Sequence, residues 1–78
     1  MRKLSVNENN KLRSVVGSNI ARYRKKAGMT QEAFASELDT DRVTVAYAEI
    51  GKRMPKVTTL YQMAKALKID IKDLFKGL

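Results

Sequence analysis

The sequence predicts an all-α fold, a compact domain of five helices, and three observations lead to it. The chain has 78 residues, of which 44% are hydrophobic, so it can bury one small core but not two. It contains no Cys and no His, so neither disulfides nor the common zinc sites can stabilise it. Its apolar residues recur at spacings of three and four, in segments separated by capping residues and glycines, as in amphipathic helices.

A flexible polar N-terminal arm is expected over residues 1–10, which carry few apolar groups, and the folded domain over residues 11–78. The first helix is expected over residues 11–27, because apolar residues recur on one face of it. These residues are Leu12, Val16, Ile20 and Tyr23. Gly28 then ends the helix, since glycine readily adopts the left-handed conformation that follows a helix.

The second helix is expected over residues 31–38, where Thr30 is a favourable N-cap. Its buried stripe consists of Phe34, Ala35 and Leu38. The segment Asp39-Thr40-Asp41 breaks the apolar pattern and forms a turn, and Asp41 is placed to cap the next helix.

A third helix is expected over residues 42–50, although its β-branched and aromatic residues favour a strand by propensity. We expect a helix because a lone strand would have no partner in this chain. In addition, Val45 and Ala48 fit the inner face of a helix, and tertiary context commonly overrides propensity. Gly51 ends this segment, and a basic loop over residues 52–55 follows.

Two further elements complete the five. The fourth helix is expected over residues 57–67, where apolar residues again follow helical spacing. These residues are Val57, Leu60, Tyr61, Ala64 and Leu67. Asp70 is placed to cap a short final turn or helix over residues 71–76.

The amino-acid composition favours some classes of function and excludes others. Sixteen basic and eight acidic residues leave a net charge of +8, which favours a polyanionic partner, nucleic acid first and an anionic surface second. Without Cys or His, the chain lacks a thiol nucleophile and the usual general base at neutral pH, so we do not expect an enzyme, a metal or a cofactor. No apolar run approaches the roughly 18 residues of a membrane span, and no secretory signal is seen, so a cytoplasmic protein is expected.

The spacing from Gln31 to Gly51 is the most informative signal. It describes two short helices joined by a three-residue turn, with the small Ala35 where the second helix of the pair packs closely. This is the spacing of a helix-turn-helix, in which the second helix of the pair is the recognition helix that enters the major groove of DNA.

Several stretches resemble the phage-repressor-like (Xre/Cro/C1-type) helix-turn-helix regulators. They are IARYRKKAGMTQE at residues 20–32, EIGKRMP at residues 49–55, TLYQMAKAL at residues 59–67 and DLF at residues 73–75. The resemblance covers residues 16–75 and implies a lambda-repressor-like DNA-binding domain. The sequence departs from the family pattern at Asp39, where Gly is usual, and on the recognition helix at Val43 and Tyr47.

The outer face of the recognition helix supplies the expected base contacts. Arg42 can fork onto guanine, Val43 suits a thymine methyl group, and Thr44 suits a base or a phosphate. Tyr47, one turn beyond Val43, suits a base edge or a phosphate. An exposed helical face is the alternative, but an outward Val and Tyr beside an Arg make an unusual solvated surface.

Other roles follow from the resemblance. Gln31 matches a family glutamine that binds a phosphate and braces the recognition helix, and the basic loop lies along the sugar-phosphate backbone in the family. The expected phosphate contacts are Gln31, Lys52, Arg53 and Lys56. Arg24 and Glu49 match a partly buried ion pair between the first and third helices. Leu74, Phe75 and Leu78 either close the core or form a two-fold interface.

The sequence therefore predicts a sequence-specific regulator of transcription, a repressor or autoregulator, that binds double-stranded DNA as a homodimer on a palindromic operator. It would act in the bacterial or phage-infected cytoplasm, at the nucleoid, without a small-molecule ligand. The alternative is a protein–protein interaction module or antitoxin-type partner that keeps the fold with weak or no specific DNA binding.

Overall fold

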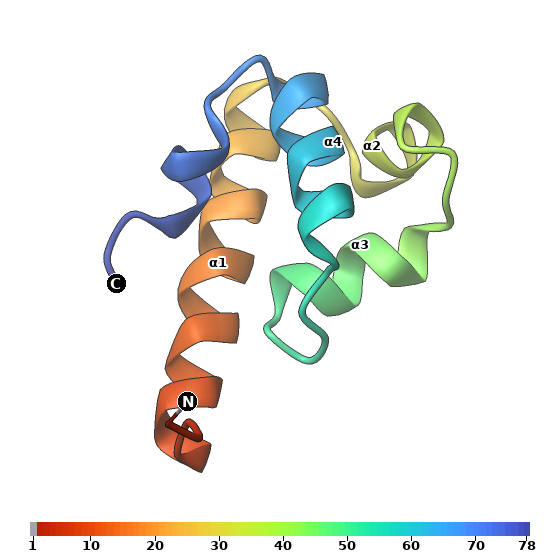
Figure 1. Cartoon of the computed structure of the whole chain (residues 1–78). Helices are drawn as coiled ribbons and strands as arrows, with labels where there is room; N and C mark the ends of the chain where they lie inside the picture. Colours follow the sequence, from red (N-terminus) through yellow and green to blue (C-terminus); the bar gives the residue numbers. More distant parts are fainter. Residues whose placement is uncertain (1) are drawn as a thin grey trace.

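The computed structural model describes residues 2–78, and in this part of the chain every regular element is helical. Figure 1 shows α1 and α4 side by side, α3 running crosswise to them, and α2 at the outer edge. The elements are α1 (Val6–Lys26), α2 (Gln31–Glu37), α3 (Arg42–Glu49), α4 (Val57–Leu67) and the 3₁₀-helix η1 (Ile71–Phe75). The all-α prediction is confirmed for these residues.

The expected number of five helices is wrong, because these residues form four α-helices and the last element is a 3₁₀-helix. The element is only five residues long, and so short a segment favours the tighter i→i+3 hydrogen bonds over α-helical ones. The Asp73 N–H donates to the Asp70 carbonyl at 3.0 Å in this way.

The expected start of the first helix at residue 11 is also wrong, since α1 begins at Val6. Ser5 and Glu8 form a capping box. The Glu8 N–H donates to the Ser5 hydroxyl oxygen at 3.1 Å, and the Ser5 N–H donates to the Glu8 carboxylate at 2.9 Å. The first turns of α1 project beyond the other helices (Figure 1). Met1, the first residue of the expected arm, lies outside the described residues.

The helix boundaries around the turn follow the predicted caps. The Thr30 hydroxyl oxygen accepts from the Ala33 N–H at 3.0 Å, and the Asp41 carboxylate accepts from the Thr44 N–H at 2.8 Å. Asp39 adopts a left-handed φ of 55° in the turn between them. These caps set where α2 and α3 begin, and the two helices follow each other at the spacing of a helix-turn-helix.

The core lies where α1, α3, α4 and η1 meet the inner face of α2. Its buried apolar residues are Val16, Ile20, Phe34, Ala35, Val45, Ala48, Leu60, Met63, Ala64, Leu67 and Leu74. The expected inner face of α4 needs correction, since Val57 and Tyr61 are 72% and 53% exposed while Met63 is fully buried. A stripe at residues 60, 63, 64 and 67 satisfies the helical spacing as well, and packing selects that one.

Two residues of α1 determine how α3 and the C-terminal segment pack against it. The sequence pattern did not single out either of them. A Cβ atom on Gly17 would lie 2.3 Å from the Ala48 carbonyl oxygen, so the backbones of α1 and α3 pack directly against each other. The side-chain amide of the buried Asn19 donates to the carbonyl oxygens of Leu74 and Lys76, both at 2.9 Å. The C-terminal segment is therefore tied to α1.

Candidate nucleic-acid interface

Helix α3 turns one face to the core and the other outward. Val45 and Ala48 are 0% and 3% exposed. Arg42 and Val43 are exposed, and Tyr47 is half-buried one turn further along. The helix forms despite its β-branched residues because α3 packs against α1 and α2, and the burial of Val45 and Ala48 there outweighs a small difference in propensity.

Thr44, the fourth expected base contact, has a local role. Its hydroxyl donates to the Asp41 carboxylate at 2.8 Å, which also accepts the Thr44 N–H. These two bonds, the backbone one first, lower the pKa of Asp41 below its ordinary value. The Thr44 hydroxyl proton is therefore engaged with the N-cap residue of α3, and the hydroxyl oxygen remains able to accept a hydrogen bond.

Arg24 and Glu49 form an ion pair between α1 and α3. Arg24 Nε lies 2.6 Å from Glu49 Oε2, and Arg24 Nη2 donates to Glu49 Oε1 at 3.1 Å. The two side chains are only 9% and 5% exposed. The hydrogen bond to Glu49 raises the pKa of Arg24. A two-pronged pair of this kind fixes both the distance and the orientation of the two helices.

Gln31 extends this pair to the surface. Its amide nitrogen donates to Glu49 Oε1 at 3.0 Å, and its amide oxygen accepts from Arg42 Nη1 at 3.2 Å. A continuous polar network therefore runs from the buried Arg24 through α3 and α2 to the exposed Arg42. The structure thus brings together one expected base-contacting residue, one expected phosphate-contacting residue and the expected ion pair.

The loop between α3 and α4 carries the expected cations Lys52, Arg53 and Lys56 on the surface. The Arg13 Nε–H donates to the Gly51 carbonyl oxygen at 3.1 Å, which ties the start of the loop to α1. Arg13 was not among the predicted site residues, because nothing in its local sequence links it to position 51. The loop therefore presents its cations beside the C-terminal end of α3.

The three residues expected either to close the core or to form a two-fold interface differ in their exposure. Leu74 is fully buried in the core of its own chain, so its side chain offers no surface to a partner. Phe75 is half-buried, and Leu78 is 58% exposed. Of the three expected residues, only Phe75 and Leu78 have surface available.

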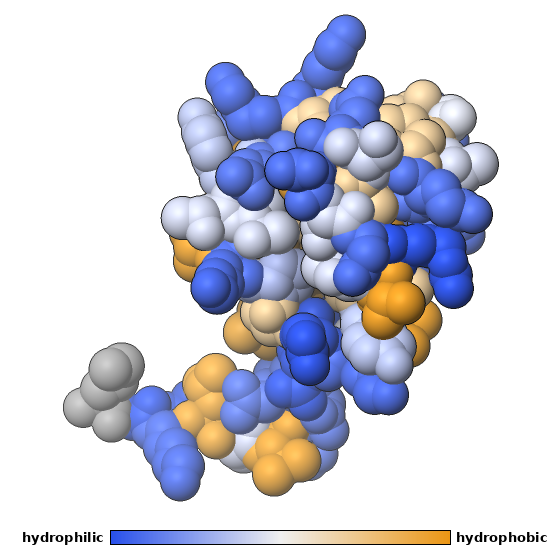
Figure 2. Space-filling model, turned by 90° about the vertical axis from the view of Figure 1, so that its right-hand side faces the viewer, coloured by the Kyte–Doolittle hydropathy of each residue, from blue (hydrophilic) through white to orange (hydrophobic). Residues whose placement is uncertain are grey.

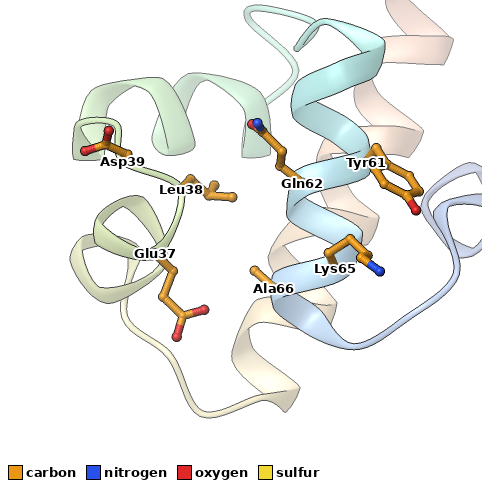
Figure 3. A pocket seen from close by; sticks show the side chains of 7 residues that line it. All are labelled: Glu37, Leu38, Asp39, Tyr61, Gln62, Lys65 and Ala66. Carbon is orange, nitrogen blue, oxygen red and sulfur yellow. The ribbon is translucent and has the colours of Figure 1, made fainter.

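A groove opens between the end of α2 and α4. Figure 3 shows Leu38 and Ala66 on its facing sides, with Glu37 and Asp39 on the α2 side. Tyr61, Gln62 and Lys65 complete the lining from α4. No residue of α3 or of the basic loop lines this groove, so it is separate from the surface described above.

The side of the molecule that carries α2 and α3 is largely hydrophilic, with hydrophobic groups in small separate patches (Figure 2). Among residues 2–78, no helix is long and apolar enough to span a membrane. Within the same residues, no group of three acidic, His or Cys side chains is arranged to hold a metal ion.

Comparison with known proteins agrees with this geometry. The helix-turn-helix family profile matches residues 20–74. The chain is 39% identical to the HTH-type transcriptional regulator y4dJ of Sinorhizobium fredii, over 76% of this chain and 77% of that protein. It is 32% identical to the control protein C.MunI of Mycoplasma sp, over 80% and 85% of the two chains.

A solved structure resembles the fold. The restriction-modification controller protein C.AhdI of Aeromonas hydrophila superposes with a TM-score of 0.77 at 28% identity, over 81% of this chain and 96% of that one. All three relatives are named as regulators or control proteins, and none as an enzyme. The chain belongs to the helix-turn-helix family and is a DNA-binding transcriptional regulator.

Proposed function

We propose that this protein binds a palindromic operator as a homodimer and reads its sequence with the outer face of α3. The observation that carries the proposal is the polar network that ends at Arg42. It holds α3 against α1 and α2 and fixes one side of the Arg42 guanidinium, while Arg42 remains exposed to solvent. A pre-oriented guanidinium suits bidentate recognition of guanine O6 and N7.

The neighbours of Arg42 on α3 complete the base-reading surface. Val43 is 48% exposed and supplies the apolar contact that a thymine methyl group needs. Tyr47 lies one turn further on and presents its ring and hydroxyl to a base edge or a phosphate. The Thr44 hydroxyl donates its proton to Asp41, and its oxygen is able to accept a hydrogen bond from a base.

Positioning on the duplex comes from the basic loop. Lys52, Arg53 and Lys56 are exposed beside the C-terminal end of α3 and would neutralise phosphates next to the major groove. Gln31 retains one amide hydrogen beyond its bond to Glu49, and this hydrogen suits a phosphate oxygen.

A single helix-turn-helix reads few bases, so we propose a two-fold dimer with half-sites about 34 Å apart. The surface available at the C-terminal end is Phe75 together with Leu78. The relatives C.MunI and C.AhdI are named as control proteins, and this favours an autoregulatory role in a restriction-modification system over other small regulators. Such a regulator would act at the bacterial nucleoid.

Selection of bound duplexes from a random DNA pool tests the proposal. The wild-type protein should enrich an inverted repeat with half-sites one helical turn apart. Arg42→Ala should lose the preference at one position in each half-site, at a cost of about 1–3 kcal/mol. Lys72→Ala, which removes an exposed cation of η1, is the matched control and should enrich the wild-type motif.

Two outcomes would contradict the proposal in different ways. If the wild-type protein enriches no motif, the chain is better explained as a protein–protein interaction module that retains the fold. If it enriches a single half-site without a symmetric partner, sequence-specific binding stands and the homodimer does not.

A further inference from the structure

The ammonium group of Lys52 lies over the ring of Tyr47, 4.5 Å from the ring centroid. Tyr47 belongs to the recognition helix, while Lys52 belongs to the basic loop that follows it. The contact therefore joins a residue proposed to meet a base edge with a residue proposed to meet a phosphate. A cation at this distance from an aromatic face is attracted by the negative potential of the ring.

The backbone at the end of α3 creates this contact. The Lys52 N–H donates to the Tyr47 carbonyl oxygen at 2.9 Å, and the Gly51 N–H donates to the Ala48 carbonyl oxygen at 3.2 Å. With Gly51 at a left-handed φ of 75°, this is a Schellman motif. The motif brings its outer residue back over the last turn of the helix, and here an ammonium–ring contact takes the place of the usual apolar one.

We propose that Lys52 is a positioning residue that holds the Tyr47 ring in the orientation in which it meets DNA. This inference rests on the proposed function and deepens it. The ammonium covers one face of the ring and so restricts the orientations that the Tyr47 side chain can adopt beside the operator. The ammonium has three N–H donors, so it can contact a phosphate oxygen while it remains over the ring.

The proposal makes base preference depend on a residue that contacts no base. A phosphate contact alone would lower the affinity for all sequences by about the same factor. Loss of the ring contact frees Tyr47 to adopt other rotamers, so discrimination at the base it meets should fall by about three-fold, the size expected of an exposed cation–ring contact. The two roles of Lys52 are therefore separable by experiment.

The chain offers two matched controls. Lys56 is an exposed cation of the same loop and stacks on none of the three tyrosines. Lys65 lies 5.7 Å from the ring centroid of Tyr61 on α4, away from α3, so it repeats the chemistry outside the proposed interface. Lys56→Met should weaken binding without a change in preference, and Lys65→Met should leave the preference unchanged.

The experiment compares the wild-type protein, Lys52→Met, Tyr47→Leu and the double variant in selections from a random DNA pool, each at two salt concentrations. Lys52→Met should reduce discrimination at one position per half-site by about three-fold and should also reduce the salt slope by about one unit. In the Tyr47→Leu background, Lys52→Met should change only the salt slope, because there is no ring left to orient.

An unchanged motif for Lys52→Met, with uniformly weaker binding, would overturn the inference and leave Lys52 as a phosphate contact only. A changed motif for the double variant relative to Tyr47→Leu would also overturn it, because Lys52 would then act on a base directly. If the wild-type protein enriches no motif, the proposed function fails instead. NMR of the free protein then still detects the pair, through upfield-shifted Lys52 methylene protons that return to ordinary positions in Tyr47→Leu.

Discussion

The Gly17→Ala substitution tests whether helix propensity or the close contact between α1 and α3 decides the stability at this position. In the middle of a helix, alanine is more favourable than glycine by about 1 kcal/mol, so propensity alone expects a more stable protein. The structure predicts the opposite sign. A Cβ atom on Gly17 would meet the Ala48 carbonyl oxygen at 2.3 Å and the Glu49 carbonyl oxygen at 2.8 Å, where ordinary contacts begin at 3.4 Å.

The size of the effect follows from these distances. Both obstacles are backbone atoms of α3, so α3 must move away from α1 by about 1 Å to reach ordinary contact. Overpacking of this kind costs typically 1–3 kcal/mol, and a rigid backbone obstacle belongs at the upper end. After the gain in helix propensity, we expect the free energy of unfolding to fall by about 2 kcal/mol, with a Tm lower by about 10 °C.

Urea unfolding followed by far-UV circular dichroism measures this loss. Ser18→Ala, an exposed position on the same helix, is the control and should be neutral or slightly stabilising. Because α3 carries the base-reading residues, Gly17→Ala should also weaken operator binding under conditions where the protein remains folded. A variant as stable as the wild type would refute the reasoning, since it would mean that α1 and α3 do not pack backbone to backbone.

Two further predictions concern charged groups. Glu49→Ala leaves the Arg24 guanidinium without its partner at 9% exposure and should lower the free energy of unfolding by about 3–5 kcal/mol. A double Arg24→Met, Glu49→Leu variant should recover most of this loss, because no buried charge remains. Urea unfolding of both variants measures these changes, and a loss below about 1 kcal/mol for Glu49→Ala would mean that the pair is well solvated. The pKa of Asp41 is lowered by its bonds to Thr44, so its contribution to stability is complete above the ordinary value of 3.8 and is lost as the pH falls through the lower folded value. The Thr44 amide signal in NMR should therefore titrate with a midpoint below 3.8 in the wild type but not in Asp41→Asn, and a midpoint above 3.8 would contradict the cap.

Local chemistry made much of the fold predictable. The prediction for α4 matches at both ends, and the N-caps Thr30 and Asp41 occur where expected. Gly28 and Asp39 adopt positive φ values at the predicted turns. Each of these features depends on residues within about four positions of one another. The start of α1 was missed although its signal is equally local, since Ser5 and Glu8 have the spacing of a capping box.

Helical spacing by itself left the inner face of α4 undecided. Residues 57, 60, 61, 64 and 67 satisfy the rule of three and four, and so do residues 60, 63, 64 and 67. Burial of Met63 and exposure of Val57 and Tyr61 depend on where α1 and η1 lie against α4. The same holds for Leu74, whose burial shows which of two open interpretations of the C-terminal residues applies to it.

By itself, the sequence determined that this protein is a small helical domain with a helix-turn-helix, and it determined that Val45 and Ala48 form the inner face of α3. Only the tertiary structure decided how α3 is held. The bond from Arg13 to Gly51 spans 38 positions and the bond from Asn19 to Leu74 spans 55. The pair of Arg24 with Glu49 spans 25 positions, and it was expected from the family resemblance rather than from any local pattern. The close approach at Gly17 is of the same kind. Such contacts form only when packing of the whole core has placed the helices, and no local preference encodes them.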